Sequence, residues 1–293
     1  KSLRSPLTEP GIKAKAGEFI VAIDGVPTNS VKDMYSLLVG KADVPTEISL
    51  NSKPQLAGAR KIVISPLEEE YSLYHYNLVQ DNIKKVDKAS NGKIGYIYIP
   101  DMGPEGLNEF SRYFYPQLDK EGLIIDDRAN GGGNVSPMIL ERLSREPYRL
   151  TMRRGSARIG TVPDAVQVGP KVCLINKYSA SDGDLFPWGF RALGLGKLIG
   201  TRTWGGIVGI SGSLPYMDGT DIRVPFFTSY DPKTGSWIIE NHGVDPDILI
   251  DNDPVKEWNG EDQQLDRAIQ EVMKELQNRK PLPGVPAPRD FSK

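Results

Sequence analysis

A single serine stands where an apolar strand is expected to end and a helix to begin. The strand is predicted over residues 171–176 and the helix over residues 182–193, with Ser181 in the turn between them. Free backbone N–H groups and the helix dipole favour negative charge at such a helix N-terminus. The position therefore suits a nucleophile whose attack creates an oxyanion. A plain helix cap is the alternative, because serine followed by acidic residues begins many helices.

Three consecutive glycines, residues 131–133, lie between a predicted strand at residues 122–125 and a predicted helix at residues 136–143. Glycine allows backbone N–H groups to approach and face a ligand. One N–H group of this segment and that of Asp182 could converge on a carbonyl oxygen as an oxyanion hole. A phosphate cradle is a second interpretation, although the segment matches neither the P-loop nor the dinucleotide-binding pattern. A flexible turn is the third.

A polar segment, residues 240–247, follows a strand predicted at residues 236–239 and reads Glu-Asn-His-Gly-Val-Asp-Pro-Asp. Either Glu240 or His242 could assist a serine, since both side chains can accept or orient a proton. Turn formation accounts for the same residues equally well, because Asn, Asp, Gly and Pro are all typical of turns.

The composition points to a chemical site rather than to a charged surface. The 293 residues include 36 basic and 38 acidic side chains, with a formal net charge of -2 and no long run of one sign. This balance gives no electrostatic basis for binding nucleic acid or an anionic membrane. Cys173 is the only cysteine, so no internal disulfide can form, and neither a metal nor a cofactor is expected. A lone cysteine fits a reducing compartment, and the cytoplasm is the expected location, with export as the alternative if a signal peptide precedes these residues.

Residues 1–66 form a module of their own in the pattern of the sequence. The predicted elements are strands at residues 18–23, 46–50 and 60–64, a tight turn at Asp24-Gly25 and an amphipathic helix at residues 31–39. The order of strand, turn and short helix resembles the core of a PDZ domain. The opening strand and carboxylate-binding loop of that domain have no counterpart, so the resemblance implies an N-terminally incomplete PDZ-like module.

The remainder alternates strands and helices, which predicts an α/β domain with a mixed, mostly parallel sheet and flanking helices. Besides the segments above, the predicted elements are strands at residues 94–99 and 197–200 and helices at residues 104–118 and 262–277. A connector with a helix is expected within residues 67–92. Residues 67–280 are expected to form this domain, and the proline-rich residues 281–293 a surface tail.

Taken together and in this order, the three polar segments resemble the serine peptidase core of the tricorn proteases, a family related to the carboxy-terminal processing peptidases. The phrases that carry the resemblance are Gly95-Tyr-Ile-Tyr-Ile-Pro-Asp-Met102, Gly106-Leu-Asn-Glu-Phe110, Asn130-Gly-Gly-Gly133, Ser181-Asp-Gly-Asp184, Gly194-Leu-Gly-Lys-Leu-Ile-Gly-Thr-Arg-Thr-Trp-Gly-Gly206 and Glu240-Asn-His-Gly-Val-Asp-Pro-Asp247. The resemblance implies hydrolysis of peptides with Ser181 as the nucleophile. It implies an oxyanion hole from the amides of Gly133 and Asp182, and Glu240 as the acid that helps to hold a catalytic histidine.

The resemblance leaves the general base outside this chain. The related processing peptidases use a Ser–Lys dyad, and Gly206 stands in the place of their lysine. The two histidines, His75 and His242, do not match the position of the tricorn base, and His75 on the connector helix is expected to be structural. The family carries its histidine in a subdomain ahead of the PDZ module, so the isolated chain is expected to have little activity.

The resemblance also bears on specificity and partners. Tricorn proteases have an acidic residue three positions before an Arg-Arg-Gly turn and favour basic side chains, whereas Leu150 stands at that position here and predicts an apolar or undemanding pocket. A large homo-oligomer with N-terminal propeller domains is implied. Two alternatives remain: a Ser–Lys processing peptidase, which Gly206 disfavours, and a noncatalytic peptide-binding scaffold.

Overall fold

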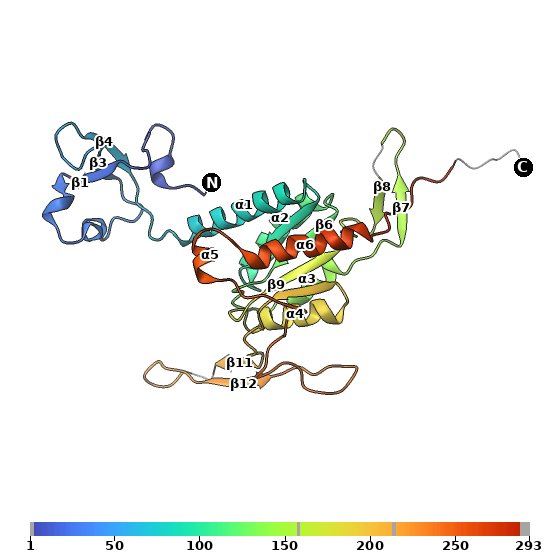
Figure 1. The fold of residues 1–293 in the computed structure, drawn as a ribbon. Coiled ribbons are helices and arrows are strands. Elements are labelled where there is room, and N and C mark those ends of the chain that lie inside the picture. Colours follow the sequence, from blue (N-terminus) through green and yellow to red (C-terminus); the bar gives the residue numbers. More distant parts are fainter. Residues whose placement is uncertain (1–2, 157–158, 213–214, 288–293) are drawn as a thin grey trace, which may run out of the picture. The chain divides into compact units, whose positions relative to one another are not determined.

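The computed structural model describes residues 3–156, 159–212 and 215–287 (Figure 1). The chain divides into two compact units, Lys1–Asp81 and Asn82–Lys293. Each unit has its own sheet and its own hydrophobic core.

The first unit is built on a four-stranded antiparallel sheet with the strand order β2-β1-β3-β4. Its elements are the strands β1 (Phe19–Ile23), β2 (Val26–Pro27), β3 (Thr46–Asn51) and β4 (Arg60–Ile64) and the 3-10 helices η1 (Pro6–Thr8), η2 (Thr28–Ser30) and η3 (Met34–Leu38). Ile23, Ile48 and Leu50 form the small core. The three predicted strands are confirmed to within one residue at either end.

The amphipathic helix predicted at residues 31–39 is wrong. The segment contains only η3, a 3-10 helix that Asp33 caps by accepting a hydrogen bond from the Tyr35 N–H at 3.0 Å. A short segment gains too few hydrogen bonds to offset the cost of starting an α-helix, so tertiary contacts decide its form. Here only the adjacent Leu37 and Leu38 of the segment pack against the core, and adjacent residues do not define a helical face.

The second unit is built on a five-stranded sheet with the order β13-β10-β9-β6-β5, and every pairing within it is parallel. The strands are β5 (Ile94–Tyr98), β6 (Gly122–Asp126), β9 (Lys171–Ile175), β10 (Gly196–Gly200) and β13 (Ile248–Leu249). All five residues of both β6 and β9 are buried, as expected where helices cover both faces of a parallel sheet. The predicted fold class is confirmed.

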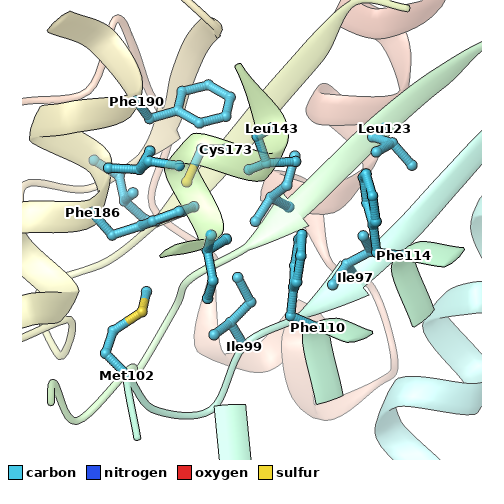
Figure 2. Close-up of a cluster of buried hydrophobic side chains, with 14 of the residues drawn as sticks. Ile97, Ile99, Met102, Phe110, Phe114, Leu123, Leu143, Cys173, Phe186 and Phe190 are labelled. Carbon is cyan, nitrogen blue, oxygen red and sulfur yellow. The ribbon is translucent and has the colours of Figure 1, made fainter. Parts of the chain in front are cut away.

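Helices cover both faces of this sheet. The helices are α1 (Tyr71–Ala89), α2 (Pro104–Phe114), α3 (Ser136–Leu143), α4 (Asp182–Ala192), α5 (Pro254–Trp258) and α6 (Gln263–Gln277). α2, α3 and α4 pack on one face, where Phe186 and Phe190 of α4 lie near Cys173 of β9 and Leu143 of α3 (Figure 2). α6 and the C-terminal part of α1 pack on the other face. No described helix is long and apolar enough to cross a membrane.

One helical prediction needs correction at its end. The helix predicted at residues 104–118 stops at Phe114 and continues as a 3-10 helix, η4 (Tyr115–Gln117). Pro116 lacks an N–H group and favours this change. The helix expected within residues 67–92 is present as α1, and Val86 near its end is buried in the core of the second unit.

Two antiparallel ribbons extend the second unit and were not predicted. β7 (Arg149–Met152) pairs with β8 (Ile159–Val162), and β11 (Gly209–Gly212) pairs with β12 (Arg223–Phe227). The strand predicted at residues 236–239 is wrong, because Trp237 makes only an isolated bridge to Tyr230. An apolar run becomes a strand only where a neighbouring strand offers a ladder of hydrogen bonds.

Lys171 is a buried lysine at the first position of β9. The residue is 7% exposed, and its Nζ donates hydrogen bonds to the backbone carbonyls of Gln167 at 2.8 Å and Gly169 at 3.2 Å. Burial, with a further contribution from the positive charge of Arg279, lowers the pKa of Lys171 to about 8. A lysine in the unfolded chain titrates at about 10.4, so the unfolded state binds more protons between these two values.

The free energy of unfolding is therefore expected to gain about 2.5 kcal/mol from Lys171 between about pH 8 and about pH 10. K171M should lack this gain. Urea unfolding of both proteins across this pH range measures the gain as the difference between their free energies of unfolding. The buried Cys173 and Tyr96, whose pKa values are raised, contribute equally to both proteins, so their effects cancel in this difference. A difference between wild type and variant that does not change with pH would contradict the prediction.

Candidate active site

Ser181 lies on a strained turn at the carboxyl end of the parallel sheet. Its backbone has φ 58° and ψ −120°, a conformation that costs a non-glycine residue free energy. Two hydrogen bonds hold the turn from below: the Ala180 N–H donates to the Asn130 carbonyl at 2.9 Å, and the Ser179 hydroxyl donates to the Asp127 carbonyl at 2.8 Å. The Ser181 side chain makes no capping hydrogen bond to α4. Ser181 thus occupies the half-buried turn before α4 without capping the helix through its side chain.

The glycine segment lies directly against this turn. A Cβ atom built on Gly132 would be 2.7 Å from the Ser181 Cβ and 3.2 Å from the Asp182 nitrogen. The segment is also fixed on its other side, where the Met102 N–H donates to the Gly132 carbonyl at 2.8 Å and the Asn134 N–H donates to the Met102 carbonyl at 2.7 Å. The structure therefore brings the first two predicted segments together.

The backbone N–H groups of Gly133 and Asp182 have no hydrogen-bond acceptor among the residues that the structure describes. The Asp182 carboxylate accepts hydrogen bonds from the N–H and the hydroxyl of Ser136, so it joins the first turn of α4 to that of α3. The amide of Asp182 is left for another acceptor. Two such N–H groups beside a serine can stabilise an oxyanion if they converge on it.

Buried carboxyl groups lie beneath this turn. Asp127 is fully buried, and burial raises its pKa well above the usual range, with further contributions from the charges of Asp126, Asp184 and Asp182. Its neutral form is therefore favoured. The neighbouring Asp126 forms an ion pair with Arg128 at 2.5 Å. The sequence patterns gave no sign that Asp127 would be buried, since the strand prediction ended before it.

Asp184 links α4 to the loop at residues 203–206. Its Oδ1 accepts a hydrogen bond from the Gly205 N–H at 2.8 Å, and burial raises the pKa of its carboxyl group. The Trp204 N–H donates to the Ser179 carbonyl at 3.0 Å, so the same loop also contacts the serine turn. The loop follows β10, whose carboxyl end lies beside that of β9 in the parallel sheet.

Glu240 lies on the far side of that loop. Its Oε2 accepts hydrogen bonds from the N–H groups of Ile207 at 2.7 Å and Val208 at 2.9 Å, and the Asn241 N–H donates to the Gly205 carbonyl at 2.7 Å. The loop thus connects the third predicted segment to the serine turn. Within the described part of the chain, the hydrogen bonds found for Glu240 go to backbone groups and not to a histidine.

Among the described residues, the hydrogen-bond partner found for the His242 ring is Asp245, whose carboxylate is 2.6 Å away, and not Ser181. His242 also lines a cavity of about 700 Å³ together with residues of the C-terminal half of α4. His75 belongs to the first unit, where its ring stacks on Tyr71 with a centroid separation of 6.0 Å.

Leu150, the predicted pocket residue, lies on β7 opposite Thr161 of β8 and is half-buried. The ribbon that carries it is separate from the five-stranded sheet that carries Ser181. Its contribution to a pocket stays a prediction. Within residues 3–156, 159–212 and 215–287, no group of three or more His, Cys, Asp or Glu side chains is placed to hold a metal ion.

Comparison with known proteins shows that this parallel α/β sheet, with its strained serine turn and glycine loop, is that of a serine peptidase. Residues 93–250 match Peptidase family S41, and residues 1–69 match the tricorn protease PDZ domain. The first match covers more than half of the chain, so the chain belongs to peptidase family S41. The sequence-based resemblance to tricorn proteases is confirmed.

Similar proteins include several tricorn proteases. The chain is 39% identical over 280 residues to the tricorn protease of Thermoplasma volcanium, covering 94% of this chain and 26% of that protein. It is 40% identical over 276 residues to that of Thermoplasma acidophilum, covering 94% and 25%. A crystal structure of the tricorn protease superposes with a TM-score of 0.84 at 39% identity, over 94% of this chain and 26% of that one. The chain thus spans about a quarter of the length of these relatives.

Proposed function

We propose that this chain is the peptide-hydrolysing core of a tricorn-type serine peptidase. Ser181 Oγ attacks the carbonyl carbon of a peptide bond, and the N–H groups of Gly133 and Asp182 stabilise the oxyanion. The bond to the leaving amine then breaks, the amine takes up the proton lost by the serine, and water hydrolyses the acyl-enzyme. The strained serine turn beside two amides without acceptors carries this proposal.

The general base is proposed to come from outside these 293 residues. No hydrogen bond joins the Ser181 hydroxyl to a histidine or lysine among the described residues, and Gly206 offers no side chain for a Ser–Lys dyad. Glu240 is proposed to orient a histidine supplied by another part of the protein, using the Oε1 atom that Ile207 and Val208 leave free. The isolated chain should then lack most of the benefit of general-base catalysis.

Further features of the whole protein are proposed with it. The chain is proposed to consist of a PDZ-like domain at residues 1–66, a peptidase core at residues 67–280 and a tail at residues 281–293. Peptides are the proposed substrates, and propeller and histidine-bearing domains, homo-oligomer formation and a cytoplasmic location are proposed from the same likeness. An apolar pocket at Leu150 would make the complete enzyme prefer Leu or Phe over Lys before the cleaved bond, and a strong Lys preference would exclude it.

A fluorophosphonate probe tests the nucleophile in the chain itself. Ser181 should be labelled slowly at neutral pH and faster as hydroxide increases, because no base assists it within the chain. S181A should abolish labelling, whereas S144A, a change at the end of α3, should leave it unaltered. Rapid labelling would show that a base is present within the chain. Labelling that persists in S181A would refute the assignment of the nucleophile, and a wild type that is never labelled would favour a noncatalytic scaffold.

A further inference from the structure

Trp204 is a large apolar side chain exposed beside the serine turn. Its exposed fraction is 65%, although tryptophan is among the side chains that gain most from burial. Exposed aromatic side chains held in a fixed position are frequent sites of binding, because they offer a large contact area at a small cost in conformational entropy.

The backbone around Trp204 is held rigidly next to the nucleophile. The Trp204 N–H donates to the Ser179 carbonyl at 3.0 Å, and the following residue, Gly205, bonds to Asp184 through its N–H at 2.8 Å and to Asn241 through its carbonyl at 2.7 Å. Ser179 precedes Ser181 by two residues, so their Cα atoms are at most about 7.6 Å apart. A substrate residue close to the attacked bond would therefore come within reach of the indole.

The indole ring lies against Gly206. A Cβ atom at Gly206 would be 2.2 Å from Cζ3 and 2.8 Å from Cη2 of Trp204, so any side chain there would displace the ring. The absence of a side chain at residue 206 thus leaves room for the indole ring. The ring has one part packed on the Gly206 backbone and a large part that remains open to solvent.

We propose that the indole of Trp204 is a substrate-contacting group that stacks on an apolar, preferably aromatic, side chain of the peptide next to the bond that Ser181 attacks. The assignment rests on the proposed peptidase function and adds to it a preference for one class of substrate residue. Stacking of aromatic rings adds to the free energy of burial, and desolvation of the exposed ring contributes in the same direction. Trp204 determines specificity and takes no part in proton transfer.

Binding of uncleavable peptides to the full chain tests the preference without requiring catalysis. The probes are two fluorescein-labelled pentapeptides, Ala-Ala-Phe-Ala-Ala and Ala-Ala-Ala-Ala-Ala, each with a reduced bond after the third residue, and fluorescence anisotropy measures Kd. Wild type should bind the Phe peptide about tenfold more tightly than the Ala peptide. W204A should lose most of this preference, and W204F should keep most of it.

Two further variants separate contact from folding. G206A should displace the ring and reduce the preference as W204A does, whereas W258A removes a tryptophan that is 90% exposed at the end of α5 and should leave both Kd values unchanged. Equal binding of the two peptides by wild type, no measurable binding of either, or a preference that W204A leaves undiminished would overturn the inference. Fluorophosphonate labelling of wild-type Ser181 is scored separately, because that probe has no peptide part and tests the nucleophile alone.

Discussion

G133A is expected to destabilise the second unit by about 4 kcal/mol or more and to abolish labelling of Ser181. Gly133 has φ 149°, and a Cβ atom there would lie 2.0 Å from the carbonyl oxygen and 2.2 Å from the carbonyl carbon of Met102. These are backbone atoms, which cannot move aside as a flexible side chain can. Because the Asn134 N–H bonds to the same carbonyl, a shift would break the contact between the glycine loop and residue 102. The N–H group of residue 133 would then lose its place beside Ser181.

Gly131 provides the matched control in the same loop. Its added Cβ would meet no atom within 4 Å, and its φ is not in the left-handed region. The free energy of unfolding of G131A should therefore lie within about 0.5 kcal/mol of that of wild type, and Ser181 should still be labelled. Urea unfolding followed by tryptophan fluorescence measures the stability, and the fluorophosphonate measures the site. Equal stability of G133A and G131A would show that the Met102 contact does not confine the loop.

Substitutions at Ser181 are expected to separate stability from reactivity. S181A and S181G should both lose labelling completely, since neither retains the hydroxyl. The free energy of unfolding of S181G should nevertheless be about 1 kcal/mol higher than that of S181A. The reason is that φ 58° and ψ −120° correspond to a turn position that glycine favours and alanine does not. S181A should be about as stable as wild type, because the Ser181 hydroxyl makes no capping hydrogen bond.

The control for this comparison is Ser144, the residue after α3, which has φ −86° and ψ −3°. Alanine adopts this conformation readily, so S144G should be less stable than S144A by about 0.5 to 1 kcal/mol. The order of the two variants is thus reversed between the two positions. If glycine is the less stable substitution at Ser181 as well, the turn is not strained.

The regular elements of the second unit could be predicted because each has a long and clear pattern. The apolar runs of β6 and β9 are buried as expected, and the helix predicted at residues 262–277 is present as α6. Such periodic burial depends on residues that are near one another in the sequence. The ribbons β7–β8 and β11–β12 could not be predicted in the same way, since their strands are short and β12 is exposed along its whole length. Nothing local distinguishes such segments from loops.

By itself, the sequence determined the parallel α/β architecture, the position of Ser181 between a strand and a helix, and the relation to tricorn proteases. The relation to tricorn proteases depends on short sequence motifs in a fixed order, which can be recognised without a structure. Only the tertiary structure decided that the Ser181 hydroxyl does not cap α4, that the glycine loop touches the serine turn, and that the His242 ring pairs with Asp245. The contact of the glycine loop with the serine turn involves segments that are far apart in the chain. The packing of parallel strand ends, rather than local residue preference, brings such segments together.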